Sequence, residues 1–268
     1  LLSDSLPHGE FLRRGELRAA LAAVTAFAMV LVSGRPFIRF LASRRVLEHS
    51  ERGDSQRLDE MHASKSRTPT LGGVVFFGAV IVSTLLWARP GERLVLVILA
   101  YVLSLCVLGF LDDTKKLRTK KGLSARAKFR TQVVLSLLAG GYLYVYPIGV
   151  THAVAGEGAG TCLFFPFFKD LYVQTGVGFI ALVACVATGS SNAVNLTDGL
   201  DGLAAGSSLL VAAAFTVIAC VAGSAEASSL FHMPHVEGGL EVAVFLGSLI
   251  GGGLGFLWFN CHPAQIFM

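Results

Sequence analysis

Long apolar runs separated by short polar loops dominate the chain. Each run is close to the roughly 20 residues that a helix needs to cross about 30 Å of hydrocarbon. Only 15% of the residues are charged, whereas soluble domains carry about 25%. The pattern predicts a membrane protein and argues against an ordinary soluble domain. Seven spans are expected, at residues 17–34, 71–88, 94–111, 131–150, 176–192, 201–222 and 240–259.

Helices, rather than strands, are expected to form these spans. In lipid, every backbone polar group must be satisfied within the protein, and a helix does this within one segment. Strands of a membrane barrel would alternate apolar and polar residues, and the run at residues 94–99 does not alternate. The predicted fold class is therefore all-α, a polytopic transmembrane helical bundle that forms one integral-membrane domain over residues 1–268.

Lysine and arginine residues gather in two of the loops. Residues 35–67 hold eight and residues 112–130 hold eight more, out of 22 in the chain. Because cytoplasmic loops of membrane proteins carry the excess of Lys and Arg, both loops are expected in the cytoplasm. The alternation of seven spans then places residues 192–200 and 260–268 on the same side.

Small residues mark the last apolar run. Gly247, Gly251 and Gly255 form consecutive GxxxG spacings, which predict close helix packing. The glycines of this run do not fit GxGxxG and no strand pattern precedes them, so a dinucleotide-binding turn is excluded.

The first of four polar clusters on the predicted cytoplasmic side is Asp112-Asp113, at the end of the third span. Two carboxylates against a bilayer face cost free energy unless they are paired or bind a metal. Neighbouring helix residues point about 100° apart, so the pair is not expected to chelate one ion symmetrically. One carboxylate would bind metal or act as a base while the other orients a neighbour. A solvated helix end is the alternative.

The second cluster places a polar side chain at every third position, at Asn192, Asn195, Asp198 and Asp201. If the helix persists, this spacing stacks the four along one face. The glycine after each aspartate instead predicts a break that lets a ligand approach the backbone. Non-helical backbone at this depth is tolerated only where it lines a wet cavity, so the cluster indicates a site.

Two further clusters occupy residues 65–73 and 259–267. Ordinary helix-boundary chemistry is the alternative to a functional role for the Thr and Pro of the first, and a structural role is the alternative for His262 of the second. The predicted topology nevertheless puts all four clusters on one side. Carboxylates, carboxamides and many Lys and Arg together suit Mg²⁺ and a polyphosphate, because Mg²⁺ takes oxygen ligands and bridges carboxylates to phosphates.

In this order the motifs resemble the polyprenyl-phosphate N-acetylhexosamine-1-phosphate transferase superfamily. The resemblance rests on Asp112-Asp113, on residues 192–202 and on Phe259-Asn-x-x-Pro-Ala. Within that superfamily the chain most resembles the phospho-N-acetylmuramoyl-pentapeptide transferases, and the match covers about residues 35–268. Three segments carry this finer resemblance: His62-x-x-Lys65-x-x-Thr-Pro-Thr-x-Gly-Gly, Gly122-Leu-Ser-Ala-Arg-x-Lys128 and Pro166-Phe-Phe-Lys169.

The resemblance implies a Mg²⁺-dependent reaction of peptidoglycan biosynthesis. Phospho-MurNAc-pentapeptide moves from UDP-MurNAc-pentapeptide to undecaprenyl phosphate, which gives UMP and lipid I. It also implies a ten-span fold in the bacterial inner membrane, a site that faces the cytoplasm, membrane lipid as a partner, a homodimer and no nucleic-acid partner. Two mechanisms stay open, namely direct attack of the lipid phosphate on the nucleotide sugar and a covalent intermediate with the enzyme.

Residue roles carry over by motif. The catalytic set is Asp112, Asp113, Lys116 and Asp198, in which Asp112 is expected to deprotonate or orient the lipid phosphate. Asp198 is expected near the metal or as nucleophile. The substrate-binding set contains the uridine-pocket residues Lys65, Gly199, Leu200, Asp201, Asn260 and Phe267, together with the cleft residues Thr70, Lys128, Asn192 and Asn195.

The chain also departs from the family pattern. Arg67 and Leu71 replace the usual Gly and Met around Thr-Pro-Thr. The family continues past Phe-Met with Gly-Asp-Thr-Gly-Ser, whose Asp is a principal Mg²⁺ ligand. The chain starts at Leu1 without Met and ends at Met268. We therefore expect the domain to be incomplete at its C-terminal end. Whether it is also incomplete at its N-terminal end stays open. We expect residues 1–268 by themselves to be inactive.

Two alternatives remain at the level of sequence. A transferase of GlcNAc-1-phosphate to a polyprenyl phosphate shares the superfamily motifs, although the Thr-Pro-Thr and Gly-Leu-Ser-Ala-Arg segments argue against it. A transporter also carries broken helices and buried acids. It would place polar residues near the bilayer midplane and show inverted repeats, and neither is visible here.

Overall fold

The computed structural model describes residues 14–44, 68–119, 122–152, 155–157, 159–165 and 168–267. Eight α-helices account for most of these residues. They are α2 (Gly15–Ser43), α4 (Gly73–Trp87), α5 (Arg93–Thr119), α6 (Ala125–Val145), α7 (Gly178–Thr197), α8 (Leu203–Gly223), α9 (Ala225–Phe231) and α10 (Gly239–Asn260).

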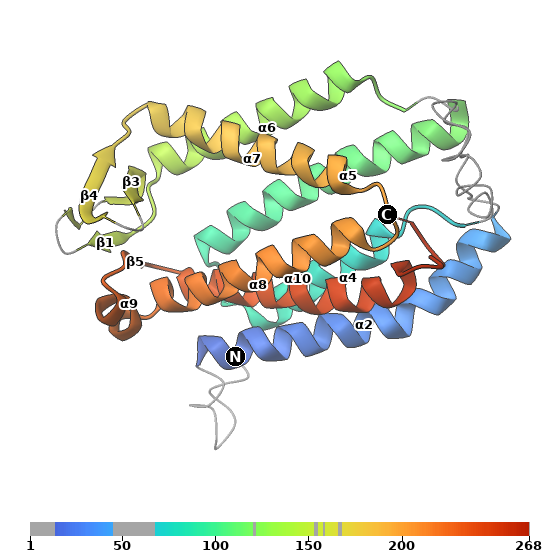
Figure 1. Cartoon of the computed structure of the whole chain (residues 1–268), viewed down its shortest axis with the longest axis horizontal. Coiled ribbons are helices and arrows are strands. Elements are labelled where there is room, and N and C mark those ends of the chain that lie inside the picture. Colours follow the sequence, from blue (N-terminus) through green and yellow to red (C-terminus); the bar gives the residue numbers. More distant parts are fainter. Residues whose placement is uncertain are drawn as a thin grey trace.

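The long helices run side by side along the molecule, as Figure 1 shows. The predicted all-α, polytopic bundle is therefore confirmed. Among the described residues, five helices, α2, α5, α7, α8 and α10, are long and apolar enough to cross a membrane. The other two predicted spans correspond to α4, which has only 15 residues, and to α6, whose first turns carry Arg126, Lys128 and Arg130.

Helix α10 is the centre of the packing, and more than half of the residues in its most apolar stretch are buried. It lies against α2 through the glycines that the sequence singled out. A Cβ atom at Gly247 would lie 2.3 Å from the Ala19 backbone oxygen, and one at Gly251 would lie 1.8 Å from that of Ala23. The predicted close helix packing is confirmed, because only glycine lets the two backbones approach this far.

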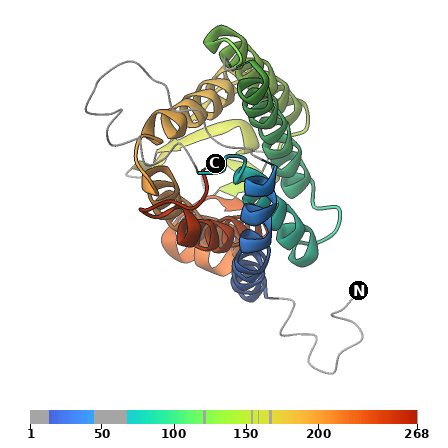
Figure 2. The same cartoon turned by 90° about the vertical axis from the view of Figure 1, so that its right-hand side faces the viewer.

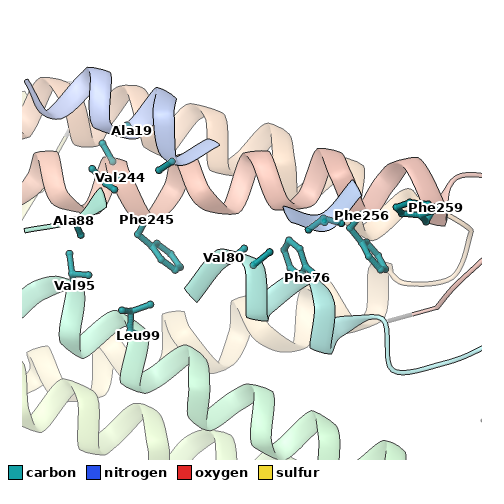
Figure 3. Close-up of a cluster of buried hydrophobic side chains, with 14 of the residues drawn as sticks. Ala19, Phe76, Val80, Ala88, Val95, Leu99, Val244, Phe245, Phe256 and Phe259 are labelled. Carbon is teal, nitrogen blue, oxygen red and sulfur yellow. The ribbon is translucent and has the colours of Figure 1, made fainter. Parts of the chain in front are cut away.

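Aromatic and branched side chains fill the space between α10 and α4 (Figure 3). The rings of Phe76 and Phe256 lie 5.8 Å apart, and Val80 and Val244 are fully buried. This cluster fixes where α4 begins and where α10 ends. These two helix ends matter for the site, because the polar cluster at residues 65–73 leads into α4 and the cluster at residues 259–267 follows α10.

A buried ion pair joins the opposite ends of the same helices. Arg18 Nη1 donates to Glu241 Oε2 at 2.8 Å and to the Trp87 backbone oxygen at 3.1 Å. The Arg89 backbone N–H also donates to Glu241 Oε2, at 2.8 Å. A buried charge is costly unless it is paired and hydrogen-bonded, so this cluster holds α2, α4 and α10 in one register.

Short strands, which the sequence analysis did not predict, occupy the end of the bundle where Glu241 lies. They are β1 (Val150–His152), β2 (Gly156–Glu157), β3 (Cys162–Phe165), β4 (Phe168–Gln174) and β5 (His235–Val236), with a 3-10 turn, η1, at Ala159–Thr161. The strand β1 pairs with β2 and β5, and β3 pairs with β4, all antiparallel. We call this the far end, and it includes α9 (Figure 1).

Gly251→Ala should destabilise the bundle, because the new methyl group would overlap the Ala23 backbone oxygen. We expect the free energy of unfolding to fall by roughly 1–3 kcal/mol, which thermal unfolding in detergent would detect as a lower Tm. The matched control is Gly141→Ala in α6, where a Cβ meets nothing within 4 Å. Equal melting temperatures for the two variants would contradict this packing.

Candidate functional site

Seven ends of the described helices lie at the end of the bundle opposite the strands, and we call it the site end. The helices α2, α5, α7 and α10 finish there, and α4, α6 and α8 begin there (Figure 1). Viewed from this side, the segment after α10 turns into the middle of the surrounding helices (Figure 2). The four polar clusters of the sequence belong to this end, apart from residues 65–67 of the third cluster. These three residues, Lys65 among them, lie outside the described residues.

Asp112 makes three contacts at the site end, two with ammonium groups and one with a backbone N–H. Its Oδ2 accepts from Lys128 Nζ at 2.6 Å and lies 2.8 Å from Lys116 Nζ. Its Oδ1 accepts from the Leu123 backbone N–H at 2.7 Å. The side chain is only 8% exposed. Asp112 therefore ties the end of α5 to the start of α6 and holds two ammonium groups together.

Gly122 makes this arrangement possible. A Cβ atom at this position would lie 2.5 Å from Asp112 Oδ1 and 3.1 Å from the Lys116 side chain. The next residues start α6, where the Ser124 hydroxyl caps the helix by accepting from the Ala127 backbone N–H at 3.2 Å. The Gly122-Leu-Ser segment is thus a connection that fits directly over a carboxylate.

Asp113 points elsewhere, as the 100° rotation between helix neighbours requires. Its Oδ1 accepts from Lys116 Nζ at 3.2 Å, and 22% of its side chain is exposed. The expectation that the two carboxylates act separately therefore agrees with the geometry. Lys116 contacts both, whereas Lys128 bonds to Asp112.

A row of polar side chains on α6 connects α5 to α7. Lys128, Gln132 and Ser136 recur every four residues and share one helix face. Lys128 bonds to Asp112 of α5, and Gln132 bonds to Ser191 and Asn192 of α7, at 3.1 and 2.9 Å. Deeper in the bundle, the buried Ser136 contacts Tyr101 at 2.9 Å and Thr188 at 3.2 Å. Gln132 and Ser136 were missed from the sequence, where only their four-residue spacing from Lys128 marks them.

The second cluster is partly helical. Helix α7 continues through Asn192 and Asn195 to Thr197, and it ends at Asp198, whose φ and ψ are −76° and 65°. The chain turns at Gly202, with φ of 77°, and α8 begins at Leu203. The two readings of the spacing each hold for part of the segment, since the asparagines stack on a helix and the aspartates belong to the break.

Asn260 holds the break against the end of α10. Its Oδ1 accepts from the Gly202 backbone N–H at 3.1 Å, and its Nδ2 donates to the Ile266 backbone oxygen at 2.9 Å. The residue is buried. Its side-chain amide is therefore occupied by backbone groups, and Asn260 positions the two segments around it.

The remaining predicted residues of the uridine pocket lie around this junction. The Phe267 backbone N–H donates to the Pro69 oxygen at 2.9 Å, and its carbonyl accepts from Gly72 at 2.7 Å, which brings Thr70 beside the end of the chain. Asp201 Oδ2 lies 3.1 Å from His262 Nδ1. The structure thus brings Thr70, Asp201, Asn260 and Phe267 into adjoining segments, next to the exposed Leu200.

The described residues do not form a complete set of metal ligands by themselves. Among the described residues, no three His, Cys, Asp or Glu side chains lie close enough together to hold a metal ion. The oxygen donors at the site end come from separate elements, namely Asp113 on α5, Asn192 on α7 and Asp198 in the break that follows α7. This chemistry suits Mg²⁺, which keeps several waters and substrate phosphates among its ligands.

Comparison with known families adds one finding. A family described as glycosyl transferase family 4 matches residues 95–268, which is more than half of the chain. The matched part runs from α5 to the last residue and includes the Asp112-Asp113 pair, the α7–α8 break and the Asn260 junction. This match supports the superfamily that the motifs resemble and does not distinguish its members.

Removing the Asn260 side chain should loosen the junction. In Asn260→Ala, we expect the backbone amides of Gly202, Gly72 and Phe267 to exchange their hydrogens about fivefold faster or more, because a net hydrogen bond contributes about 1 kcal/mol. Hydrogen–deuterium exchange read by mass spectrometry measures this. In the control Asn260→Asp, which keeps the acceptor Oδ1, the Gly202 amide should stay protected. Unchanged exchange in Asn260→Ala would contradict the role of the Asn260 side chain in holding the junction.

Proposed function

The chain belongs to glycosyl transferase family 4, and from this premise we propose that it transfers phospho-MurNAc-pentapeptide from UDP-MurNAc-pentapeptide to undecaprenyl phosphate. Family membership supports the coarser statement, the transfer of a sugar phosphate to a polyprenyl phosphate by a multi-pass membrane protein. The finer choice of substrate rests on the resemblance of the Thr68-Pro-Thr70 and Gly122–Lys128 segments to the pentapeptide transferases.

The proposed reaction exchanges one phosphoanhydride for another. An oxygen of the lipid phosphate forms a bond to the sugar-linked phosphorus of the UDP-sugar, and the bond from that phosphorus to the bridging oxygen of UMP breaks. The products are the lipid-linked diphosphate sugar and UMP. The main obstacle is the repulsion between two anions, so charge screening and positioning must supply most of the catalysis.

The observation that carries the proposal is the cluster of Asp112, Lys116 and Lys128. Both lysine Nζ atoms lie within 2.8 Å of Asp112 Oδ2, and both remain partly exposed, at 51% and 34%. A phosphate that arrives from the lipid can accept from these ammonium groups, since charge-assisted bonds to phosphate are strong. We propose that Asp112 orients the lipid phosphate through the two lysines, and that Asp113 lies beside the reacting oxygen.

The uridine nucleotide would lie at the junction of Asp201, Asn260 and Phe267. Aromatic stacking of Phe267 on the uracil ring would contribute about 1–3 kcal/mol. Asp198 follows α7, the helix that carries Asn192, and precedes the turn at Gly202 that Asn260 holds, so we propose it as the protein ligand of Mg²⁺. When bound, the ion would neutralise the charge of the pyrophosphate. The positive-inside pattern supports a cytoplasmic position of the site in a bacterial inner membrane.

The experiment that tests the proposal measures UMP release by the purified full-length protein with undecaprenyl phosphate and Mg²⁺. We expect release with UDP-MurNAc-pentapeptide and none with UDP-GlcNAc. Release with UDP-GlcNAc alone would replace the proposed substrate by the other member of the superfamily. A lack of UMP release with either nucleotide, together with solute uptake into proteoliposomes, would favour a transporter.

Within the same assay, Lys128→Met should lower kcat/KM for undecaprenyl phosphate by roughly 10–100-fold, because one charge-assisted hydrogen bond contributes about 1.5–3 kcal/mol. Glu226→Gln is the matched control, since Glu226 is an exposed residue of α9 at the far end. A Lys128→Met variant as active as this control would remove the lysine cluster from the mechanism.

A further inference from the structure

We propose that Gln132 is a positioning residue that fixes the amide of Asn192, so that the amide oxygen of Asn192 faces the bound nucleotide sugar and its cation. Gln132 has no role in the substrate or catalytic sets derived above. The inference about the hydrogen bonds of Asn192 stands on geometry alone, whereas the identity of its ligand rests on the proposed function.

The orientation of the Asn192 amide follows from one backbone group. Asn192 Nδ2 lies 2.8 Å from the Thr188 backbone oxygen, one turn earlier in α7. A carbonyl oxygen only accepts hydrogen bonds, so the atom that faces it must be the amide nitrogen. The second hydrogen of that nitrogen points to Gln132 Oε1, at 2.9 Å. Both donors of Asn192 are therefore used inside the bundle.

The orientation of Gln132 follows in turn. Because its Oε1 accepts from Asn192, its Nε2 is the atom that reaches Ser191 Oγ, at 3.1 Å. Each contact thus fixes the next, from the Thr188 backbone to Asn192, Gln132 and Ser191. A part-buried chain of this kind gives each amide one orientation, since a flipped amide would place two acceptors against each other.

The consequence is that Asn192 Oδ1 points away from α6. Among the described residues, no donor reaches this oxygen. An amide oxygen is a ligand for Mg²⁺ and an acceptor for N–H and O–H groups. Asn192 lies six residues before Asp198, the proposed Mg²⁺ ligand, so its oxygen is suited to an electropositive group of the bound complex, either the cation or a donor of the sugar.

Helix α6 then positions both halves of the site from adjacent turns. Lys128 holds Asp112 of α5, and Gln132, four residues later, holds Asn192 of α7. Ser136, one further turn along and fully buried, closes the row against Tyr101 and Thr188. A shift of α6 would move both motifs together, which gives this helix a role that neither motif shows alone.

Side-chain amide NMR tests the geometry without any assay of function. Residues 1–268 contain three asparagines, at positions 192, 195 and 260, so ¹⁵N-asparagine labelling gives few NH₂ signals from this part, and Asn192→Ala assigns the one of interest. In the full-length protein, we expect both amide protons of Asn192 to exchange slowly with water. Gln132→Leu should speed one of them about fivefold or more, while Gln132→Glu, which keeps the acceptor, should restore slow exchange. Fast exchange of both protons in the unaltered protein would overturn the proposal.

A double-mutant cycle tests the functional part. Gln132→Leu should lower kcat/KM for UMP release roughly tenfold in the unaltered background and have no further effect in the Asn192→Ala background, because Gln132 acts through Asn192. Additive losses would mean that Gln132 serves the fold only, and would overturn the positioning role. A rise in the Mg²⁺ or Mn²⁺ activation constant in both single variants would assign the cation as ligand of Oδ1, whereas a rise in KM for the nucleotide sugar would assign the sugar. If the unaltered protein releases no UMP, the proposed function fails, and the NMR result still decides the geometry.

Discussion

Polar side chains inside a membrane bundle persist only where each meets a partner on a neighbouring helix, and this requirement organises the site end. An unpaired polar group in hydrocarbon costs several kcal/mol. The row on α6 has partners on both neighbouring helices, because Lys128 bonds to a carboxylate of α5 and Gln132 bonds to an amide of α7. The same contacts that make these groups tolerable also fix where they point, so satisfaction of hydrogen bonds and positioning of the site are one feature.

Helix α10 supplies the packed frame for the junction around Asn260. Its glycines bring the α2 backbone into direct contact, and its aromatic residues fix the start of α4. The Arg18–Glu241 pair closes the same three helices at the far end. Asn260 extends this frame into the site, since it joins the last turn of α10 to the break between α7 and α8. The helix that packs against α2 and α4 therefore also carries the residue that holds the junction.

The sequence predicted the fold class and most of the helices, because a 20-residue apolar run has few other solutions in a membrane. Helix boundaries were less accurate where charge and helix overlap. The start of α6 at Ala125 was placed at 131, since Arg126, Lys128 and Arg130 lie outside any apolar run, although Ser124 marks the cap. The strands were missed because strands of only two to seven residues leave almost no periodic signal in the sequence. Gln132 was missed for a different reason: one amide in an apolar run gains meaning only from its partner on α7.

The polar motifs themselves were recognisable as a site, but their internal roles were not. Asp112 and Asp113 look equivalent in sequence, and the structure separates them by burial and by partners. The sequence predicts Asn260 in the uridine pocket, and the structure adds that its amide bonds to backbone groups of two segments. In both cases the deciding contact comes from a residue far along the chain, which no local pattern reports.

The central claim is that the Asp112-Asp113 pair and the α7–α8 break lie on one side of the membrane. Single cysteines at Lys115, Leu200 and Leu230, in a variant without the five native cysteines, test it most directly with a membrane-impermeant maleimide in oriented vesicles. All three positions are exposed. The account predicts that positions 115 and 200 are labelled from the cytoplasmic side and position 230 from the opposite side. Labelling of positions 115 and 200 from opposite sides would contradict it.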